Sequence, residues 1–342
     1  MMNDSTSYKR TIQNKSASLT IDLLGGAITD LHLHDEEKIN PLSFAFTKEQ
    51  MPPNNKAGAV YQGHFLCLGR WGLPSEGEIK AGVPNHGQFA NIMWNELQQN
   101  DDLLLRMHVN SELEGLYIKR ELKLHKEHAV FTTKETVINP QLLGRLYNMV
   151  QHPTLACPFL DDTVIVDCNG TKGFDQSNIH QDFNWHCAKL KDDTLIDLRT
   201  PVYPYNAVFT FAADQSQEYA WITAYSSKYN LLFGYVWKRI YYPWIHLWQH
   251  FEEGKIKYRG IEFGTAALHL PFKEILKHGT KKFGEKTTEY IDAGEQVCRE
   301  YTCFLCAARD VHRVTKVELN KTVGELIVYY NNVQQIKLSL PV

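Results

Sequence analysis

One acidic residue interrupts a strand-like apolar run and has a glycine two residues away on either side. Glu262 lies in residues 258–265, which read YRGIEFGT. In a β-strand alternate side chains share a face, so Gly260 and Gly264 are expected on the same face as Glu262. Because glycine within a strand often marks the close approach of another group, the pattern favours a carboxylate that a small molecule can reach. The alternative is a strand acid that faces water beside a bulge or bend.

Two further segments place ionisable side chains among turn residues. Residues 69–87 read GRWGLPSEGEIKAGVPNHG and hold Arg70 and His86. Loops of this kind often carry binding residues on a rigid scaffold, although this one could also be a surface connection with solvated charges. In residues 148–154, which read NMVQHPT, His152 ends an apolar, strand-like run. A structural histidine is the alternative there.

Considered together, Glu262, His152 and His86 indicate acid–base chemistry. Reference pKa values of about 4.3 for Glu and about 6.5 for His leave a carboxylate able to accept a proton and an imidazolium able to donate one near neutral pH. A Glu and a His that face each other would therefore suit reversible proton transfer at two oxygens of one small substrate.

β-Strands are the elements expected to position these residues, because alternation with period 2 recurs along the chain and helical periodicity is scarce. One short helix-like segment covers residues 272–277, and the polar segment 175–200 is expected to be a long surface loop. The pattern predicts an all-β fold, a large antiparallel β-sandwich or a related sheet structure. The expected strands are residues 27–34, 103–110, 116–125, 129–138, 219–226, 230–238, 256–264, 297–307, 314–319, 324–330 and 334–340.

Composition is that of a globular protein with a large core. Hydrophobic residues make up 43% of the 342 residues and charged residues 22%, close to the usual averages. No change of composition divides the chain, and a β-sandwich can reach this length as one unit, so residues 1–342 are expected to form a single domain. The net charge of −3 gives no reason to expect nucleic acid or an anionic membrane as a partner.

Targeting and cysteine patterns favour a cytoplasmic protein. Residues 1–21 contain no apolar segment typical of a signal peptide, and no run of about eighteen apolar residues predicts a membrane-spanning helix. The seven cysteines lie at irregular spacing and are expected to be free thiols, which favours a reducing compartment.

No cofactor or metal is predicted. His32 and His34 share a strand face but have no third ligand at a recognisable spacing, so they are expected to belong to a polar sheet face. Residues 279–287, GTKKFGEKT, have one residue too many before the lysine for a phosphate-binding loop. The sequence also contains no GxSxG or GxGxxG pattern, so it does not support a serine hydrolase or a dinucleotide enzyme.

Four short motifs, in order, resemble those of the aldose 1-epimerase (galactose mutarotase-like) family. Residues 23–31, LLGGAITDL, resemble the opening strand pair around a glycine. The string NHG at 85–87, followed by Trp94, resembles the family's HG…W segment, and QHP at 151–153 resembles the segment with the catalytic histidine. Residues 244–262, from WIHLW to GIE, resemble the segment that ends in the catalytic glutamate. The resemblance covers about residues 15–310.

The resemblance implies a large antiparallel β-sandwich of the galactose mutarotase type and a role for each motif residue. Glu262 would take the proton of the anomeric hydroxyl of a cyclic aldose while His152 protonates the ring oxygen. The ring would then open, the C1–C2 bond would rotate, and the ring would close as the other anomer. His86 would hydrogen-bond the substrate. Three aromatic residues could stack on a sugar face or could equally belong to the core: Trp94, Trp248 and Tyr242.

One departure from the family pattern affects the expected substrate. Many relatives carry an Arg a few residues after the HG pair, whereas residues 88–91 are QFAN. Arg70 could supply this charge from the preceding loop, in which case the substrate is not expected to be plain galactose in the usual pose. The neighbouring Glu76 and Glu78 also suggest a specialised pocket.

Two other classes of function stay open at this point. The first is a carbohydrate-binding or regulatory protein without catalysis on the same scaffold. The second is a glycoside-cleaving enzyme, which needs two carboxylates flanking the scissile bond, with Glu76 or Glu78 as the partner of Glu262.

Overall fold

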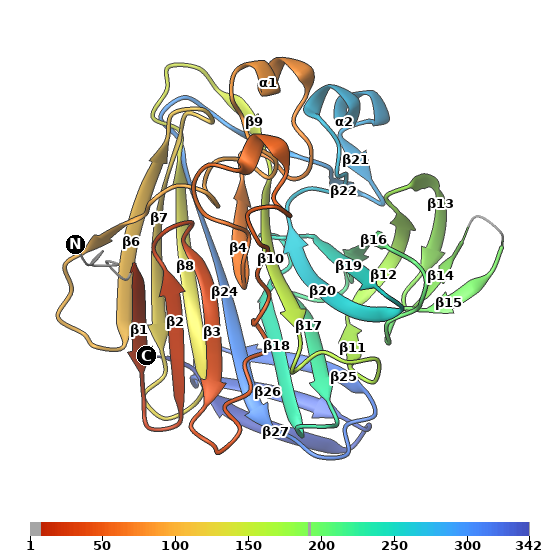
Figure 1. The fold of residues 1–342 in the computed structure, drawn as a ribbon. Coiled ribbons are helices and arrows are strands. Elements are labelled where there is room, and N and C mark those ends of the chain that lie inside the picture. The colour runs from red at the N-terminus through yellow and green to blue at the C-terminus, as the bar shows by residue number, and fades with distance from the viewer. Residues whose placement is uncertain (1–7, 191–192, 342) are drawn as a thin grey trace.

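The alternating apolar and polar residues of this chain build two large antiparallel sheets that face each other (Figure 1). The computed structural model describes residues 8–190 and 193–341. The ten-stranded sheet contains, in spatial order, β1 (Lys9–Gln13), β2 (Ala17–Asp22), β3 (Ala27–Leu33), β4 (His64–Leu68), β10 (Met149–Ala156), β20 (Lys255–Gly264), β19 (Trp244–Glu252), β16 (Ala207–Ala213), β12 (Gly170–Asp175) and β13 (Asn178–Asn184).

The second sheet has eight strands and contributes the other inner face. Its spatial order is β11 (Ile165–Cys168), β17 (Tyr219–Ser226), β18 (Leu231–Lys238), β24 (Gln296–Ala307), β8 (Val130–Ile138), β7 (Leu116–Leu124), β6 (Leu104–Ser111) and β5 (Asn95–Leu97). Side chains that point inward from the two sheets form the largest apolar core, since successive residues of a strand point to opposite faces.

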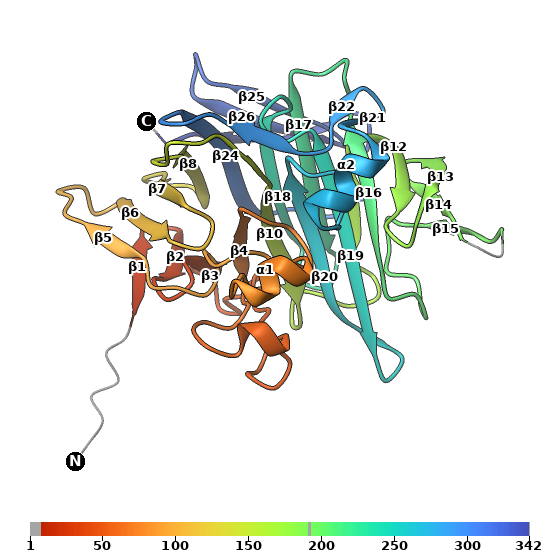
Figure 2. The same cartoon turned by 90° about the horizontal axis from the view of Figure 1, so that it is seen from above.

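A third layer covers the outer face of the eight-stranded sheet (Figure 2). It is a three-stranded antiparallel sheet of β25 (Val314–Asn320), β26 (Glu325–Tyr330) and β27 (Gln334–Ser339). Its apolar residues, among them Leu326 and Val328, pack with Trp221 and Phe304 of the eight-stranded sheet in a separate cluster. The eight-stranded sheet is therefore buried on both faces where this layer covers it.

The remaining elements are short. The helices are α1 (Glu76–Lys80), α2 (Phe272–His278) and a 3-10 turn, η1 (Pro53–Asn55). Among the residues that the structure describes, no helix is long and apolar enough to cross a membrane. Three further two-stranded pairs are β14 (Cys187–Lys189) with β15 (Leu195–Asp197), β21 (Lys281–Lys282) with β22 (Glu285–Lys286), and β9 (Arg145–Tyr147) with β23 (Glu289–Ile291).

The prediction for residues 175–200 was wrong for most of that segment. Instead of one long loop, it contains β13, β14 and β15. These strands are polar because β13 lies at the edge of the ten-stranded sheet and is partly exposed, with Phe183 as its one buried side chain. Residues 191–192 lie outside the described residues. All eleven strands that the alternation predicted are present, with bounds that differ by at most one residue, and the helix over 272–277 is also confirmed.

Arg120, in the middle of β7, lies at a position where the alternation of the strand predicts a buried apolar side chain. Arg120 is buried, and its Nε atom donates to Oε1 of the buried Glu135 at 2.6 Å. Its guanidinium also lies over the ring of Trp94, 4.6 Å from the ring centre. A charge inside a sandwich core is tolerated only when it is paired in this way.

Five adjacent strands of the ten-stranded sheet carry the candidate site on their outer face. These are β4, β10, β20, β19 and β16. Loops cover that face, and they bring apolar side chains such as Phe44, Tyr61 and Trp71 into a cluster separate from the sandwich core. Every residue of β10 is buried, because the core covers one of its faces and the loops cover the other.

Candidate active site

The register of the ten-stranded sheet places His152 directly opposite Glu262. The flanking pairs of β10 and β20 are Val150–Gly264 and Thr154–Gly260, so position 152 of β10 faces position 262 of β20. His246 of β19 faces Glu262 from the other side. Side chains that are opposite one another in neighbouring strands share a face. The result is a row across five strands: Phe65, His152, Glu262, His246 and Thr210.

His152 and Glu262 touch each other in this row. Nε2 of His152 lies 3.2 Å from Oε1 of Glu262, and both side chains are almost completely buried. The other ring nitrogen of His152, Nδ1, lies 3.1 Å from the hydroxyl of Thr154. That hydroxyl is 3.5 Å from the carbonyl oxygen of His152, to which it can donate. With Nδ1–H donating to Thr154, Nε2 is left to exchange a proton with the carboxyl group.

Burial shifts the pKa values of this pair in opposite directions. The loss of solvation raises the pKa of Glu262 well above its usual 4.5, against a smaller lowering by the Trp71 side chain. The same loss of solvation lowers the pKa of His152 well below 6.5. Burial disfavours the charged form of each group. In the empty site the favoured arrangement is therefore a protonated Glu262 facing a neutral His152.

The glycines on either side of Glu262 share its face, as the strand pattern predicts, but they make room for protein side chains. A Cβ atom on Gly260 would lie 2.6 Å from Oε1 of Glu262 and 3.1 Å from Cβ of Trp248. A Cβ atom on Gly264 would lie 2.5 Å from a methyl group of Val150. Gly260 thus allows the carboxyl group to fold back beside Trp248, and Gly264 allows β10 to pack closely.

His152 does not end its strand, in contrast to the prediction. It lies in the middle of β10, which continues through Pro153 to Ala156. The prediction failed because proline is uncommon in a central strand, where it cannot donate to the sheet. Pro153 is tolerated here because it lies in the stretch between Gln151 and Thr154 where no paired residues link β10 to β20.

Three connecting segments bring Trp71, His86 and His269 to the row. The loop after β4 carries Trp71, whose ring lies 4.1 Å from that of His246 and 4.8 Å from that of His269. His86 follows α1, and its Nδ1 accepts a hydrogen bond from the backbone N–H of Gly72 at 3.2 Å. The His86 ring lies 5.6 Å from that of His152. Burial lowers the pKa of His86 well below 6.5 and that of His269 to about 4.

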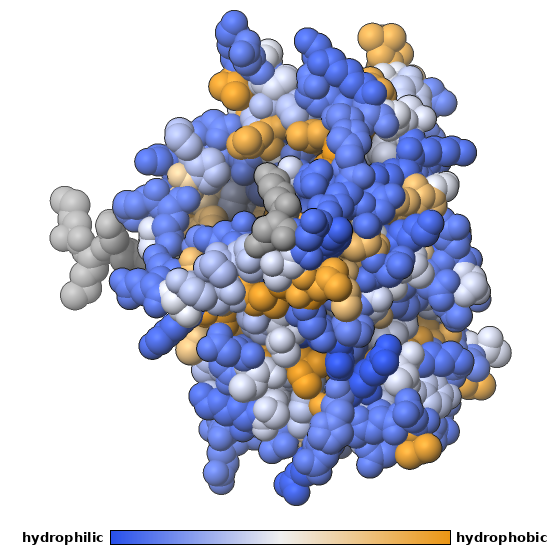
Figure 3. All heavy atoms as spheres, turned by 90° about the vertical axis from the view of Figure 1, so that its right-hand side faces the viewer, coloured by the Kyte–Doolittle hydropathy of each residue, from blue (hydrophilic) through white to orange (hydrophobic). Residues whose placement is uncertain are grey.

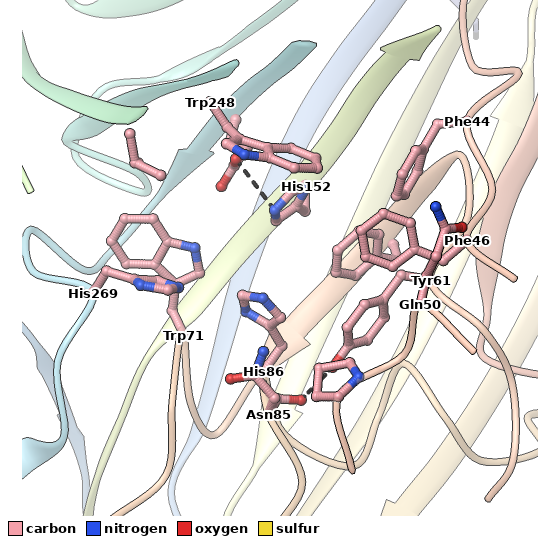
Figure 4. A pocket seen from close by; sticks show the side chains of 14 residues that line it. Phe44, Phe46, Gln50, Tyr61, Trp71, Asn85, His86, His152, Trp248 and His269 are labelled. Carbon is pink, nitrogen blue, oxygen red and sulfur yellow. Dashed lines mark hydrogen bonds and ion pairs between the residues drawn. The ribbon is translucent and has the colours of Figure 1, made fainter. Parts of the chain in front are cut away.

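These side chains enclose a cavity of about 170 Å³ above the His152–Glu262 pair (Figure 4). Figure 4 shows Phe44, Phe46 and Tyr61 on one side and Trp71 and His269 on the other. The remaining lining residues are Gln50, Pro52, Phe65, Asn85, His86, Val208 and Trp248. Apolar and aromatic walls with a few convergent polar groups are typical of small-molecule sites.

Two polar atoms of cavity-lining residues are buried without a hydrogen-bond partner. They are Oε2 of Glu262 and Oδ1 of Asn85. Buried polar atoms are nearly always hydrogen-bonded, so these two atoms are available to accept hydrogen bonds from water or a small molecule in the cavity. Sugar hydroxyls are donors of this kind.

Of the residues that the sequence indicated, four line the cavity: Glu262, His152, His86 and Trp248. Three others lie elsewhere, and we place them outside the site. Trp94 and Tyr242 are buried in the sandwich core, where Nε1 of Trp94 donates to the Phe89 carbonyl and the Tyr242 hydroxyl packs near Gln151. Both rings point to the inner face of a sheet, and the site is on the outer face.

Arg70 also lies outside the cavity. Its guanidinium pairs with Glu78, donates to the carbonyl of Leu73 and lies over the ring of Phe272. Glu78 in turn caps α1 through the backbone N–H of Ser75. Arg70 therefore does not replace the missing family arginine at the cavity, because its charge is neutralised in the loop that it stabilises.

Several lining residues had no signal in the sequence that pointed to them. Trp71 and Asn85 lie within segments noted for their Gly and Pro content, but nothing distinguished them from core residues. His269 lies in the loop between β20 and α2, and Phe44 and Tyr61 precede β4. Their convergence depends on how long loops fold over the sheet, which periodicity does not describe.

No metal centre is formed by the described residues. No group of three His, Cys, Asp or Glu side chains among them could hold a metal ion. Nδ1 of His32 lies 2.6 Å from Asp30, and the ring of His34 contacts Ser18 at 2.9 Å. These two histidines belong to a polar part of the sheet.

The fold has close counterparts among solved structures, although no protein-family model and no curated protein sequence matches the chain. A galactose mutarotase related enzyme from Lactobacillus acidophilus aligns with a TM-score of 0.60 and 10% identity, covering 88% of this chain and 98% of that one. A galactose mutarotase-like protein from Clostridium acetobutylicum aligns with a TM-score of 0.61 and 13% identity, covering 87% of this chain and 95% of that one. An aldose epimerase homologue from C. elegans aligns with a TM-score of 0.59 and 11% identity, covering 88% of this chain and 99% of that one. The chain thus has the galactose mutarotase-like fold that the sequence motifs predicted.

Proposed function

We propose that this protein is a divergent aldose 1-epimerase-type isomerase that interconverts the α and β anomers of a cyclic sugar. The observation that carries the proposal is the buried contact between His152 Nε2 and Glu262 Oε1 beneath an aromatic cavity. The anomeric hydroxyl oxygen and the ring oxygen of an aldose are bonded to the same carbon. Two proton-transferring groups that act on them must therefore lie close together, as these two do.

The pair carries one transferable proton. In the empty site burial favours this proton on Glu262, and its transfer across the 3.2 Å contact produces a carboxylate and an imidazolium. Both arrangements have zero net charge, so the transfer separates charge over a short distance only. A sugar that binds between the two groups replaces their contact with hydrogen bonds to its own oxygens.

The reaction then follows from proton balance. The Glu262 carboxylate takes the proton of the anomeric hydroxyl while His152 gives its proton to the ring oxygen. The bond between C1 and the ring oxygen breaks, and a C1=O double bond forms. After rotation about C1–C2, the ring oxygen attacks the other face of the aldehyde. The proton transfers run in reverse, and the pair returns to its starting state.

Two neighbouring residues would position the sugar. The His86 ring lies beside that of His152 and could hydrogen-bond the substrate near the ring oxygen. Trp248 lies at the cavity wall with its ring 6.0 Å from that of His152 and could pack on a C–H-rich sugar face.

Binding without catalysis is the second candidate. It is favoured by the direct His152–Glu262 contact and by the pKa shifts of both groups toward neutral forms. A glycoside-cleaving enzyme has no such support, because Glu262 is the one carboxylate among the described residues that line the cavity. Glu78 is held by α1 and Arg70, and Glu76 is exposed on the same helix.

The experiment is NMR exchange between α and β anomers over a panel of neutral aldoses. We expect Glu262→Gln and His152→Ala each to lower the enzymatic exchange rate about 10²- to 10⁴-fold, the usual loss when a general acid or base is removed. Glu76→Gln, at an exposed position, is the control and should exchange like the wild type. Wild-type exchange no faster than the uncatalysed rate, with sugar still bound, would establish the binding protein instead.

Location and organisation are part of the same proposal. We infer a cytoplasmic enzyme with a small carbohydrate as its substrate, formed as a single domain. All seven cysteines are unpaired, which is usual in a reducing compartment.

A further inference from the structure

A second, larger cavity lies next to the catalytic one on the same face of the ten-stranded sheet. Its volume is about 750 Å³, compared with about 170 Å³ for the cavity above His152 and Glu262. Figure 3 views the side of the molecule that carries β13, β14 and β15, where hydrophobic side chains show within a hollowed, mostly hydrophilic surface. We call the larger cavity the outer groove.

The outer groove and the catalytic cavity share a wall. Trp248 of β19 and Val208 of β16 are paired across the two strands. Each of these residues lines the catalytic cavity and also the outer groove. Trp248 also lies opposite Gly260, in the row adjacent to that of Glu262. The backbone N–H of Gln176 donates to the Val208 carbonyl at 2.9 Å and extends the same row outward to the turn after β12. The outer groove thus continues the catalytic cavity along the sheet.

A hydrogen-bonded side chain connects the groove to the catalytic loop. Oε1 of Gln176 accepts from the backbone N–H of His269 at 3.0 Å, and its Nε2 donates to the Ala267 carbonyl at 2.8 Å. His269 lines the catalytic cavity, and Gln176 lines the outer groove. The two cavities are therefore held in a fixed relation, which is required if one molecule is to occupy both.

The chemistry of the groove suits an uncharged polar ligand with apolar faces. Trp248 and Tyr205 supply aromatic surface. The side-chain amides of Gln176 and Asn206 bond to the protein around the groove and fix its shape. Asp175 is the one charged residue among its described lining residues, and no Lys or Arg is among the described residues that line either cavity. No described Lys or Arg of the lining would therefore pair with a phosphate or carboxylate on the ligand, and Arg70 is paired with Glu78 outside the catalytic cavity.

We propose that the outer groove is a subsite for the next sugar unit, so that the preferred substrate is a neutral oligosaccharide with a free reducing end. This inference rests on the proposed function, since the reducing-end ring must lie at His152 and Glu262 for its anomeric carbon to react. The adjoining unit then passes Trp248 and packs against Tyr205. Binding energy from a remote part of a substrate can be used to position its reacting part.

The test compares anomer exchange of glucose and galactose with that of cellobiose, maltose and lactose, and includes glucose 6-phosphate. We expect kcat/KM to be at least about tenfold higher for one or more of the disaccharides than for either monosaccharide, and lowest for the phosphorylated sugar. Equal values for monosaccharides and disaccharides, or the highest value for glucose 6-phosphate, would overturn the subsite.

Substitution of the groove separates this inference from the proposed function. Tyr205→Ala is expected to raise KM for the preferred disaccharide about tenfold and leave monosaccharide kinetics unchanged, because one stacking contact is lost outside the catalytic cavity. Tyr203→Ala, at a 61% exposed tyrosine that lines neither cavity, is the matched control and should change neither. An equal effect of Tyr205→Ala on both sugar classes would contradict the subsite.

A direct binding measurement completes the test. If no sugar exchanges above the uncatalysed rate, the isomerase proposal fails, and disaccharide titration followed by NMR chemical shifts decides the subsite separately. Disaccharide binding that Tyr205→Ala weakens and Tyr203→Ala does not would support the groove as a sugar site. Absence of disaccharide binding would overturn it.

Discussion

The proposed chemistry depends on a single buried carboxyl group and the ring that faces it. Glu262 and His152 are ordinary ionisable residues whose behaviour is changed by their surroundings. The aromatic cavity removes water from both, and this favours neutral forms of groups that would each be charged over part of the physiological pH range in solution. A proton that is held between two groups of opposite type is suited to exchange with two substrate oxygens.

A pH dependence of stability follows from the burial of Glu262. Its pKa is higher in the folded than in the unfolded protein, so its contribution to stability is complete below about pH 4.5 and is lost as the pH rises through the folded-state pKa. The Glu262→Gln variant has no carboxyl group to ionise at this buried position, so it does not lose this contribution to stability at high pH. We therefore expect the stability of this variant relative to the wild type to increase as the pH rises from about 6.5 to about 9, measured by urea denaturation.

The chosen pH range isolates the effect of Glu262. The pKa of His152 is lowered on folding, so its contribution is complete above about pH 6.5 and is lost only at lower pH. Exposed Glu76→Gln is the control, and its stability difference from the wild type should stay constant. A constant difference for Glu262→Gln as well would mean that burial does not disfavour its ionisation.

At the scale of the element, β20 positions the carboxyl group because Gly260 has no side chain to occupy the space beside it. The strand carries Glu262 on one face and presents Ile261 and Phe263 to the core on the other. Gly260 leaves the space into which the Glu262 carboxyl group folds beside Trp248. The register with β10 then brings His152 opposite, so strands fix both groups of the proposed acid–base pair.

Gly260→Ala is expected to impair catalysis without unfolding the protein. The new Cβ atom would lie 2.6 Å from Oε1 of Glu262, and the flexible end of that side chain would have to move away from His152. A displacement of about 1 Å can lower a rate about a hundredfold, so we expect a loss of that order in kcat/KM by NMR anomer exchange.

Two other glycines provide contrasting controls for this variant. Gly77→Ala in α1 meets no atom within 4 Å and should leave both activity and stability intact. Gly264→Ala would place its Cβ atom 2.9 Å from the carbonyl oxygen of Met149, so its main effect should be a lower melting temperature. Wild-type activity in Gly260→Ala would show that the carboxyl position is not critical.

At the scale of the whole molecule, the site and the third layer lie on opposite outer faces of the two large sheets. The loops over the ten-stranded sheet form the cavity, and the sheet of β25–β27 covers the eight-stranded sheet (Figure 2). Strand β25 of the third layer contacts β11 and β17 of the eight-stranded sheet, and the apolar residues of this layer pack in a cluster separate from the one at the cavity. Its role in this arrangement is to bury apolar surface.

Leu326→Ala is expected to destabilise the fold by about 2–5 kcal/mol, since it removes a fully buried leucine from the cluster that joins the third layer to the eight-stranded sheet. Anomer exchange by the folded protein should be unchanged, because the site is on the other side of the sandwich. Urea denaturation gives the first quantity, and NMR exchange gives the second. Val323→Ala, at a 62% exposed position, is the control and should affect neither. A rate loss in folded Leu326→Ala would show that the third layer influences the site.

The local patterns of the sequence predicted part of the strand framework and the candidate acid–base pair. Period 2 identified eleven strands, most of which have one face in a core and one that is more exposed. Short motifs indicated Glu262, His152 and His86, because acid–base groups stand out in apolar runs. Three of the five strands that carry the site, β4, β16 and β19, were not predicted, because they are largely buried on both faces and show little alternation. The edge strands of residues 175–200 were also missed, since a polar strand that is half exposed does not differ in composition from a loop.

Which aromatic residues form the cavity was settled by three-dimensional packing alone. Trp94, Tyr242 and Trp248 are equivalent as sequence signals, yet the first two face the sandwich core and the third faces the cavity. The face that a side chain occupies depends on which way its strand is turned and on what covers it, and both depend on residues far away in the chain. The sequence could therefore indicate an acid–base pair for a sugar, while the extent of its binding surface, including the outer groove beside Trp248, arises from how loops and strands meet in space.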